Sequence, residues 1–584
     1  MKFIILILAT LSIMSIEQQV IADDNDNLQE IFSEYVEYGK RNYPEGATYD
    51  GDHRYDDKVT DNSEAGILAR DDSTRNFLAK LTKINYDALS DDNRINYDLF
   101  KRSLEESLEF SRFKDYLMPI GQQNGIHLGA PQLVQFQPLS NAEEFNKYFA
   151  RLRAIGTSVD NDIANMKKGM SLGIVMPSFI MEQTLPQMES IINKNPGESI
   201  FFSAMEKGKD LSPEQRESIS NELKEIISQD INPAFQRLHD FVKNEYLPVC
   251  RQEAGVWSLP DGSDRYNLLV KYFTTLDLTY DDVHQTGLSE VARIEKEMNR
   301  IKDSIGFNGS VQEFNEFIKK DPEMFYTNKE DLMNGFREIL GKMDSKLPEL
   351  FGRLPKAPYD LKEMEEFRSK SAPAAYYYSA PEDRSRPGYF YVNTYDLPSR
   401  PKYTMTALAL HEAVPGHHLQ IAIAQELKNL PKFRRDGGYT SFVEGWALYA
   451  ESLGYETGMY EDLYQLYGAL IFEMWRACRL VVDTGIHAKK WTREEAVAYM
   501  KKYTANSDLD IKSEVDRYIA WPGQALAYKT GEMKIKELRR KSEEALGSKF
   551  DIKEFHDTML KNGALPLPLL EVEINRWIQT KLGS

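Results

Sequence analysis

The sequence predicts a large, mainly α-helical protein of two lobes, with a small β-hairpin or sheet beside one helix. Apolar residues recur at helical spacing through most of the 584 residues. Strand-like texture is convincing only between residues 373 and 404. No internal repeat, low-complexity segment or flexible linker interrupts the helical pattern. We therefore expect one helical unit enclosing a cleft, with an N-terminal lobe over 23–372 and a second lobe over 373–584.

The first 22 residues have the order of a secretory signal. Lys2 precedes a short apolar run over 3–16, and Ala22 stands before two aspartates. This order predicts a signal peptide that is removed after Ala22, because the apolar run is too short for a stable membrane span. No cysteine lies near the cleavage site, so we expect no lipid anchor. The expected product is periplasmic or secreted, without a membrane anchor.

Helical segments separated by polar turns are expected through the N-terminal lobe. The first series covers residues 27–113 and the second covers 141–246. Serine followed by proline starts a helix well, and threonine followed by acidic residues is a typical N-cap. On this basis we expect turns or new helix starts at residues 89–94, 176–177, 211–214, 258–263 and 279–282.

Two short strands are predicted at the start of the second lobe. Residues 376–378 and 389–393 are rich in tyrosine and β-branched residues, and they flank the Pro/Gly-containing segment 381–388. A strand of this kind can bind an extended peptide by edge pairing, or it can simply pack its tyrosines against helices. The sequence leaves both interpretations open. From residue 405 to the C-terminus the pattern is helical again.

Charge and cysteine content narrow the classes of partner. The formal net charge is −19, which argues against binding to nucleic acid or to anionic membrane surfaces. Cys250 and Cys478 are the chain's two cysteines. They are able to form one disulfide after export or to stay as two buried thiols, and the sequence does not decide between these.

Residues 411–418 read His-Glu-Ala-Val-Pro-Gly-His-His and are the strongest signal of chemistry in the chain. A zinc-hydrolase helix normally carries His-Glu-x-x-His, where the i, i+4 spacing puts both imidazoles on one face. Here the i+4 position is Pro415, which cannot bind a metal. Proline and glycine let the helix bulge at this point, which makes His417 the expected partner of His411.

On this interpretation His411 and His417 bind Zn²⁺, and Glu412 deprotonates the attacking water. His418 is then a neighbour and not a ligand. The competing interpretation is a kinked core helix with hydrogen-bonded histidines, but such a helix has no reason to carry Glu412 beside three imidazoles.

A third ligand is expected downstream, since a catalytic zinc takes three protein ligands and keeps one position open. Glu444 lies in the otherwise apolar helical segment 440–451, where an unpaired carboxylate would be costly. We therefore predict that Glu444 binds the metal. Glu451, two turns further on, is either an acceptor for a ligand imidazole or an exposed surface residue.

These motifs resemble a bacterial family filed as domain of unknown function 885. The resemblance rests on residues 411–418 and on Phe-Val-Glu-Gly-Trp-Ala-Leu-Tyr-Ala-Glu, and further matching segments cover most of the mature chain: 255–262, 385–393, 483–487 and 517–528. It implies a metallopeptidase-like helical fold of the glutamate-zincin type and a zinc ion, but no known substrate. More remotely, the motif is similar to the stretched His-Glu-x-x-Gly-His of the dipeptidyl peptidase III family.

Hydrolysis of an amide also requires donors that stabilise the developing oxyanion. Tyr528 and Arg517 in segment 517–528 and His487 at a helix end are the candidates. Arg384 and Arg386 on the tyrosine-rich hairpin are of a type that holds a peptide's terminal carboxylate. Each of these residues has an ordinary packing or salt-bridge role as its alternative.

The combined expectation is an exported zinc-dependent peptidase that hydrolyses peptides small enough to enter a cleft. Two alternatives remain from the sequence. One keeps the zinc and changes the bond, to an amide or ester in a small molecule or a cell-wall fragment. The other is a non-catalytic protein that binds zinc or peptide, which the presence of Glu412 disfavours because zinc retention alone needs no base.

Overall fold

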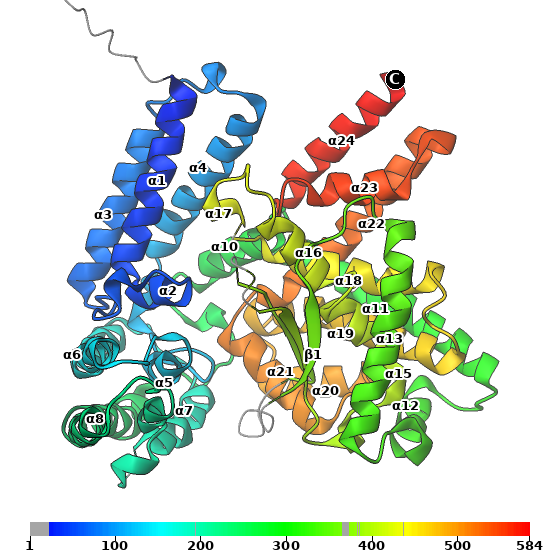
Figure 1. Ribbon diagram of the computed structural model, residues 1–584. Helices are drawn as coiled ribbons and strands as arrows, with labels where there is room; N and C mark the ends of the chain where they lie inside the picture. The colour runs from blue at the N-terminus through cyan, green and yellow to red at the C-terminus, as the bar shows by residue number, and fades with distance from the viewer. Residues whose placement is uncertain are drawn as a thin grey trace, which may run out of the picture.

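A computed structural model describes residues 23–192, 194–364, 373–381, 384, 386–435 and 437–583. Within these ranges the chain is mainly helical and contains one small sheet, as expected (Figure 1). The predicted signal peptide over residues 1–22 lies outside the described residues. Among those described, no helix combines the length and apolar character needed to cross a membrane.

The first part of the chain, up to residue 350, consists of helices joined by turns and short 3-10 segments. Its α-helices are α1 Asp24–Asn42, α2 Pro44–Tyr49, α3 Glu64–Leu81, α4 Asp91–Ser111, α5 Ile126–Phe136, α6 Ala142–Leu172, α7 Ser178–Ile191, α8 Pro213–Ile226, α9 Asn232–Phe241, α10 Gly262–Thr274, α11 Tyr280–Ile305, α12 Val311–Lys320 and α13 Lys329–Leu350.

The remainder holds the sheet and a second set of helices. These elements are β1 Tyr359–Glu363, β2 Ala375–Tyr378, β3 Gly388–Val392, α15 Lys402–Glu412, α16 His417–Gln425, α17 Lys432–Arg435, α18 Thr440–Glu456, α19 Leu463–His487, α20 Arg493–Tyr503, α21 Asp508–Ala520, α22 Ala527–Leu546, α23 Ile552–Leu560 and α24 Leu567–Gly583.

Side-chain caps explain several helix starts that the sequence predicts. Ser90 caps α4, and Ser212 and Thr279 form capping boxes at the starts of α8 and α11. In each box the side chain of the capping residue accepts from a backbone N–H of the first turn. The side chain of a glutamine or aspartate three residues later accepts from the backbone N–H of the capping residue. α8 and α9 are joined through a π-helical segment, Ile227–Ile231, so they form one long helical run.

Separate apolar cores hold the helices together. α1, α3 and α4 pack around Leu28, Phe100 and Leu104, and they form the blue group in Figure 1. The helices from α5 to α9 share a second core around Phe145 and Phe235. The largest cluster joins α13, the sheet and the helices α15, α16, α18, α22, α23 and α24.

The sheet has three strands in the order β1-β3-β2. β2 pairs with β3 in the antiparallel sense, with Tyr377 opposite Phe390, as the predicted hairpin requires. β1 pairs with β3 in the parallel sense and is not predicted by the sequence. β2 is therefore an edge strand. The expected boundary between the two lobes, after residue 372, falls between β1 and β3 in the sequence, although these two strands pair. The division into lobes at that point stays a prediction.

One local expectation differs from the structure. The helix that carries the motif does not continue through a bulge. It ends at Glu412 and a new helix begins at His417, with a turn over residues 413–416 between them. The short helix α17 lies between α16 and α18. Cys250 and Cys478 are both buried and free, which selects the second of the two alternatives for the cysteines.

Candidate metal centre

The turn between α15 and α16 brings two histidines together. The carbonyl oxygen of Ala413 accepts from the N–H of His418, and the peptide bond between Val414 and Pro415 is cis. Only glycine fits at position 416, because a Cβ atom there would lie 1.9 Å from the carbonyl oxygen of His411. This close approach folds the chain back on the end of α15. As a result the rings of His411 and His417 lie 4.8 Å apart.

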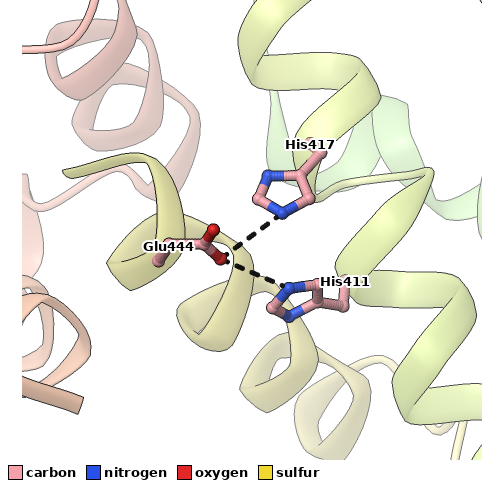
Figure 2. Close-up of side chains that lie close together, drawn as sticks. All are labelled: His411, His417 and Glu444. Atoms are coloured by element: carbon pink, nitrogen blue, oxygen red, sulfur yellow. Dashed lines mark ion pairs between the residues drawn. The ribbon is translucent and has the colours of Figure 1, made fainter. Parts of the chain in front are cut away.

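Glu444 on α18 completes a group of three potential ligands (Figure 2). Its Oε2 atom lies 3.6 Å from Nε2 of His411 and 3.5 Å from Nε2 of His417. Two ligands bound about 2.1 Å from a tetrahedral zinc ion lie about 3.4 Å apart, so these distances fit a shared cation. The Oε2 atom of Glu444 is buried and has no hydrogen-bond partner. A metal ion would satisfy it.

A close helix crossing positions Glu444. α18 and α22 cross where Gly445 meets Gly531, and a Cβ atom on Gly531 would lie 1.8 Å from the carbonyl oxygen of Ser441. The two backbones therefore touch at this point. The crossing places Tyr528, one turn before Gly531, close enough to Glu444 for the carboxylate to help raise the pKa of the phenol.

A second carboxylate fixes His411. The Nδ1 atom of His411 lies 2.8 Å from Oε1 of Glu451, which is buried and also lies 3.4 Å from Nη2 of Arg476. Burial favours a neutral His411, but Glu444 and Glu451 act against it and raise its pKa to about 9. Glu451 is therefore buried and accepts from the His411 imidazole, which excludes the alternative of an exposed surface residue.

Strand β2 holds Glu412 in place. The backbone N–H of Tyr377 donates a hydrogen bond of 2.9 Å to Oε2 of Glu412. In the register of the hairpin, Tyr377 lies opposite Phe390, and its N–H points away from β3 toward the free edge of the sheet. The carboxylate predicted to act as the base is thus fixed by the edge strand.

His418 faces away from the metal ligands. Its Nδ1 atom lies 2.8 Å from the hydroxyl of Tyr377, and its ring packs against Tyr359. Burial lowers its pKa to about 4, so the ring is neutral. These contacts agree with the expectation that His418 is a neighbour of the site and not a ligand.

Comparison with known proteins places the chain in a family. Residues 44–574 match the model of the family described as "Bacterial protein of unknown function (DUF885)". The chain belongs to this family. No curated protein matches the sequence.

Two solved structures are similar to this DUF885 protein along nearly their whole length. A "putative lipoprotein" from Colwellia psychrerythraea is 28% identical with a TM-score of 0.90, covering 96% of this chain and 100% of that one. A "putative lipoprotein of unknown function" from Shewanella oneidensis is 19% identical with a TM-score of 0.75, covering 94% and 99%. The second likeness is one of fold alone.

Of the three predicted oxyanion donors, two lie in one polar network in this DUF885 protein. The guanidinium of Arg479 stacks on the ring of Tyr528 with a separation of 4.3 Å. Arg517 donates to Gln524 and to Glu514, and Gln524 lies 3.4 Å from the hydroxyl of Tyr528. Burial raises the pKa of Tyr528, as does Glu444, so the phenol keeps its proton and remains a donor.

His487 has a different setting. Its Nδ1 atom accepts from the N–H of Val256 at 3.2 Å, and its Nε2 atom lies 3.0 Å from the carbonyl oxygen of Tyr518. Burial lowers its pKa to about 3. Because both ring nitrogens are occupied by backbone groups, the structure gives His487 a packing role, and we leave it out of the proposed mechanism.

The remaining candidates lie outside the cluster of three donors. Arg384 pairs with Glu426 at 3.1 Å, and Arg386 stacks on Tyr378.

Sequence reasoning missed Arg479, Arg476 and the backbone of Tyr377. Each acts through a contact with a residue far away in the chain, and none belongs to a recognisable motif. Only the two arginines could have been recognised from the sequence, because cations within the apolar segment that forms α19 require polar partners.

Proposed function

We propose that this protein is an exported, zinc-dependent hydrolase that cleaves peptide bonds. The observation that carries the proposal is the convergence of His411, His417 and Glu444 from separate helices, with the unpartnered Oε2 atom of Glu444 facing the two imidazoles. Two imidazoles and a carboxylate form a donor set typical of catalytic zinc in peptidases. A bound zinc ion supplies a Lewis acid for the carbonyl and for water.

The residues around the donors support hydrolysis rather than simple metal storage. Glu412 follows the ligand His411 directly, and the N–H of Tyr377 holds one oxygen of its carboxylate. In the proposed reaction Glu412 takes the proton of the attacking water and later gives it to the leaving amine. Tyr528, still protonated, donates a hydrogen bond to the developing oxyanion.

A peptide is the substrate class that the sheet favours. β2 is an edge strand that runs beside the reactive groups, and its outward-facing N–H at Tyr377 is already bonded to Glu412, so a peptide has to pair with the other backbone groups of this edge. An extended peptide can add to such an edge through backbone hydrogen bonds. The name of the Colwellia structure, a "putative lipoprotein", supports an exported location, while the expectation of a product without a lipid anchor stays a prediction.

The substitution Glu412→Gln tests the mechanism. We expect zinc content and melting temperature to stay as in the wild type, while hydrolysis of a peptide mixture, followed by mass spectrometry, falls by roughly 10²- to 10⁴-fold. Glu456→Gln, the same change at a residue of α18 that pairs with Arg539, is the matched control. Equal activity in Glu412→Gln and wild type would reject Glu412 as the base.

A further inference from the structure

A hollow of about 600 Å³ with a positively charged lining lies at the far end of α16. α16 begins at the metal ligand His417 and ends at Gln425, which is part of the lining. The cationic residues around the hollow come from three separate segments: Arg353, Lys356, Arg384 and Lys428.

One carboxylate lies among these cations. Glu426 accepts from the backbone N–H of Lys356 at 2.6 Å, and its carboxylate lies 3.1 Å from Arg384 and 3.8 Å from Arg353. Within the described part of the chain, neither Lys356 nor Lys428 forms an ion pair. The C-terminal end of α16 contributes only about half a negative charge. Among the described lining residues, four cations against one carboxylate and the helix end leave a surplus of more than two positive charges.

This surplus is unusual for the molecule. The whole chain carries a formal net charge of −19, so a local group of cations stands out against the acidic average of the chain. Holding like charges together costs free energy unless a counter-charge binds. An anionic group is the occupant that this lining complements.

Two elements, α16 and residues 377–381, give similar lengths for the path from the metal centre to the hollow. The nine residues of α16 rise by about 12 Å from His417 to Gln425. From Tyr377, which contacts Glu412, to Pro381, which lines the hollow, four residues of chain span at most about 13 Å. The two elements are also joined at the far end, where Gln425 donates to the carbonyl oxygen of Ala380.

We infer that the hollow is a subsite for a carboxylate of the peptide substrate, separated by about four residues from the bond that is cleaved. This inference rests on the proposed function. An extended peptide beside β2 reaches from Glu412 to the hollow over that length. The carboxylate is supplied either by the C-terminus of the peptide or by an aspartate or glutamate side chain.

The test uses peptides that differ in one charge. One pair has a free or an amidated C-terminus, and an amidated series has Asp or Asn at each successive position. Binding is measured by calorimetry on Glu412→Gln, and cleavage is measured on the wild type. The double variant Lys356→Glu/Lys428→Glu reverses the lysines of the hollow. Lys83→Glu/Lys296→Glu, which changes two exposed lysines elsewhere, is the matched control.

We expect the carboxylate form of a peptide to bind at least about 10-fold more tightly than its neutral partner. The lysine reversal should remove this preference and leave binding of the neutral peptide unchanged, while the control should behave as the wild type. A preference between the free and the amidated C-terminus assigns the subsite to a C-terminal carboxylate. A preference within the Asp/Asn series assigns it to an acidic side chain. Equal binding of both forms, or a preference that survives the reversal, would overturn the subsite. Selective binding without any cleavage would instead reject the proposed function and leave the subsite standing.

Discussion

The indole N–H of Trp446 donates a hydrogen bond of 2.8 Å to the carbonyl oxygen of Pro415. Both residues are buried. Trp446 lies two residues after Glu444, and Pro415 lies two residues before His417. This single contact therefore joins α18, which carries Glu444, to the turn that precedes His417.

The change Trp446→Phe should weaken zinc binding. It keeps most of the apolar contact but removes the donor and leaves a buried carbonyl unpaired, which loosens the turn. We expect the Kd for zinc, measured by competition with a chelator, to rise about 10-fold. Trp577→Phe is the control, because Trp577 packs in the same core and lies on α24. An unchanged Kd in Trp446→Phe would show that the turn holds its shape without this bond.

Glu451→Gln should lower zinc affinity by about 10- to 100-fold, because the carboxylate at Nδ1 orients His411 and makes its other nitrogen more basic. The measurement is again chelator competition at constant pH. Glu456→Gln, on the same helix but paired with Arg539, serves as the control. Equal loss of affinity in both variants would point to a general effect on α18.

Tyr528→Phe should reduce turnover without loss of zinc. The ring and its stacking against Arg479 remain, and only the hydroxyl that donates to the oxyanion is removed. We expect kcat to fall by about 10²- to 10³-fold with little change in KM. Tyr499→Phe removes a buried hydroxyl in another core and should leave kcat unchanged. A change confined to KM would assign Tyr528 to substrate binding instead.

Stability should fall as the solution becomes acidic, owing to His487 and His556. Burial lowers their pKa values to about 3 and about 4, below the unfolded value near 6.5. A depressed pKa means that the stabilisation is complete above pH 6.5 and is lost as pH falls toward the folded pKa. Each histidine should cost about 1.4 kcal/mol per pH unit between pH 6 and pH 4.

Urea unfolding at pH 7, 6 and 5 measures this effect. Glutamine at position 487 retains an acceptor and a donor for the backbone groups of Val256 and Tyr518. His487→Gln should therefore show a shallower decline with acid than the wild type. An identical slope would mean that His487 does not contribute to the acid sensitivity.

The sequence predicts that His411, His417 and Glu444 lie together, as the structure has them, but not the form of the turn before His417. Metal binding itself stays a prediction. His411, Glu412 and His417 lie close together in the sequence around a proline and a glycine. This local pattern can therefore be recognised from the sequence alone. Whether the helix bulges or breaks depends on long-range contacts such as that of Trp446 with Pro415. No residue pattern near position 415 reports that partner.

The predicted hairpin was found, while β1 was missed for a related reason. Residues 359–363 read Tyr-Asp-Leu-Lys-Glu, with a single buried residue, Leu361. Its apolar-polar alternation is limited to Tyr359 and Leu361, which is too short to predict a strand, and the segment acquires its form by pairing with β3. Arg479 and Arg476 are similar cases, since their partners lie on other helices.

Metal analysis of purified protein is the most direct test of the central claim that three side chains share one cation. After incubation with zinc and dialysis, the account predicts about one equivalent of zinc in the wild type and strongly reduced zinc in His411→Ala, His417→Ala and Glu444→Ala. All four proteins should remain folded by circular dichroism. A folded wild type that binds no divalent ion, or variants that retain zinc as fully as the wild type, would contradict it.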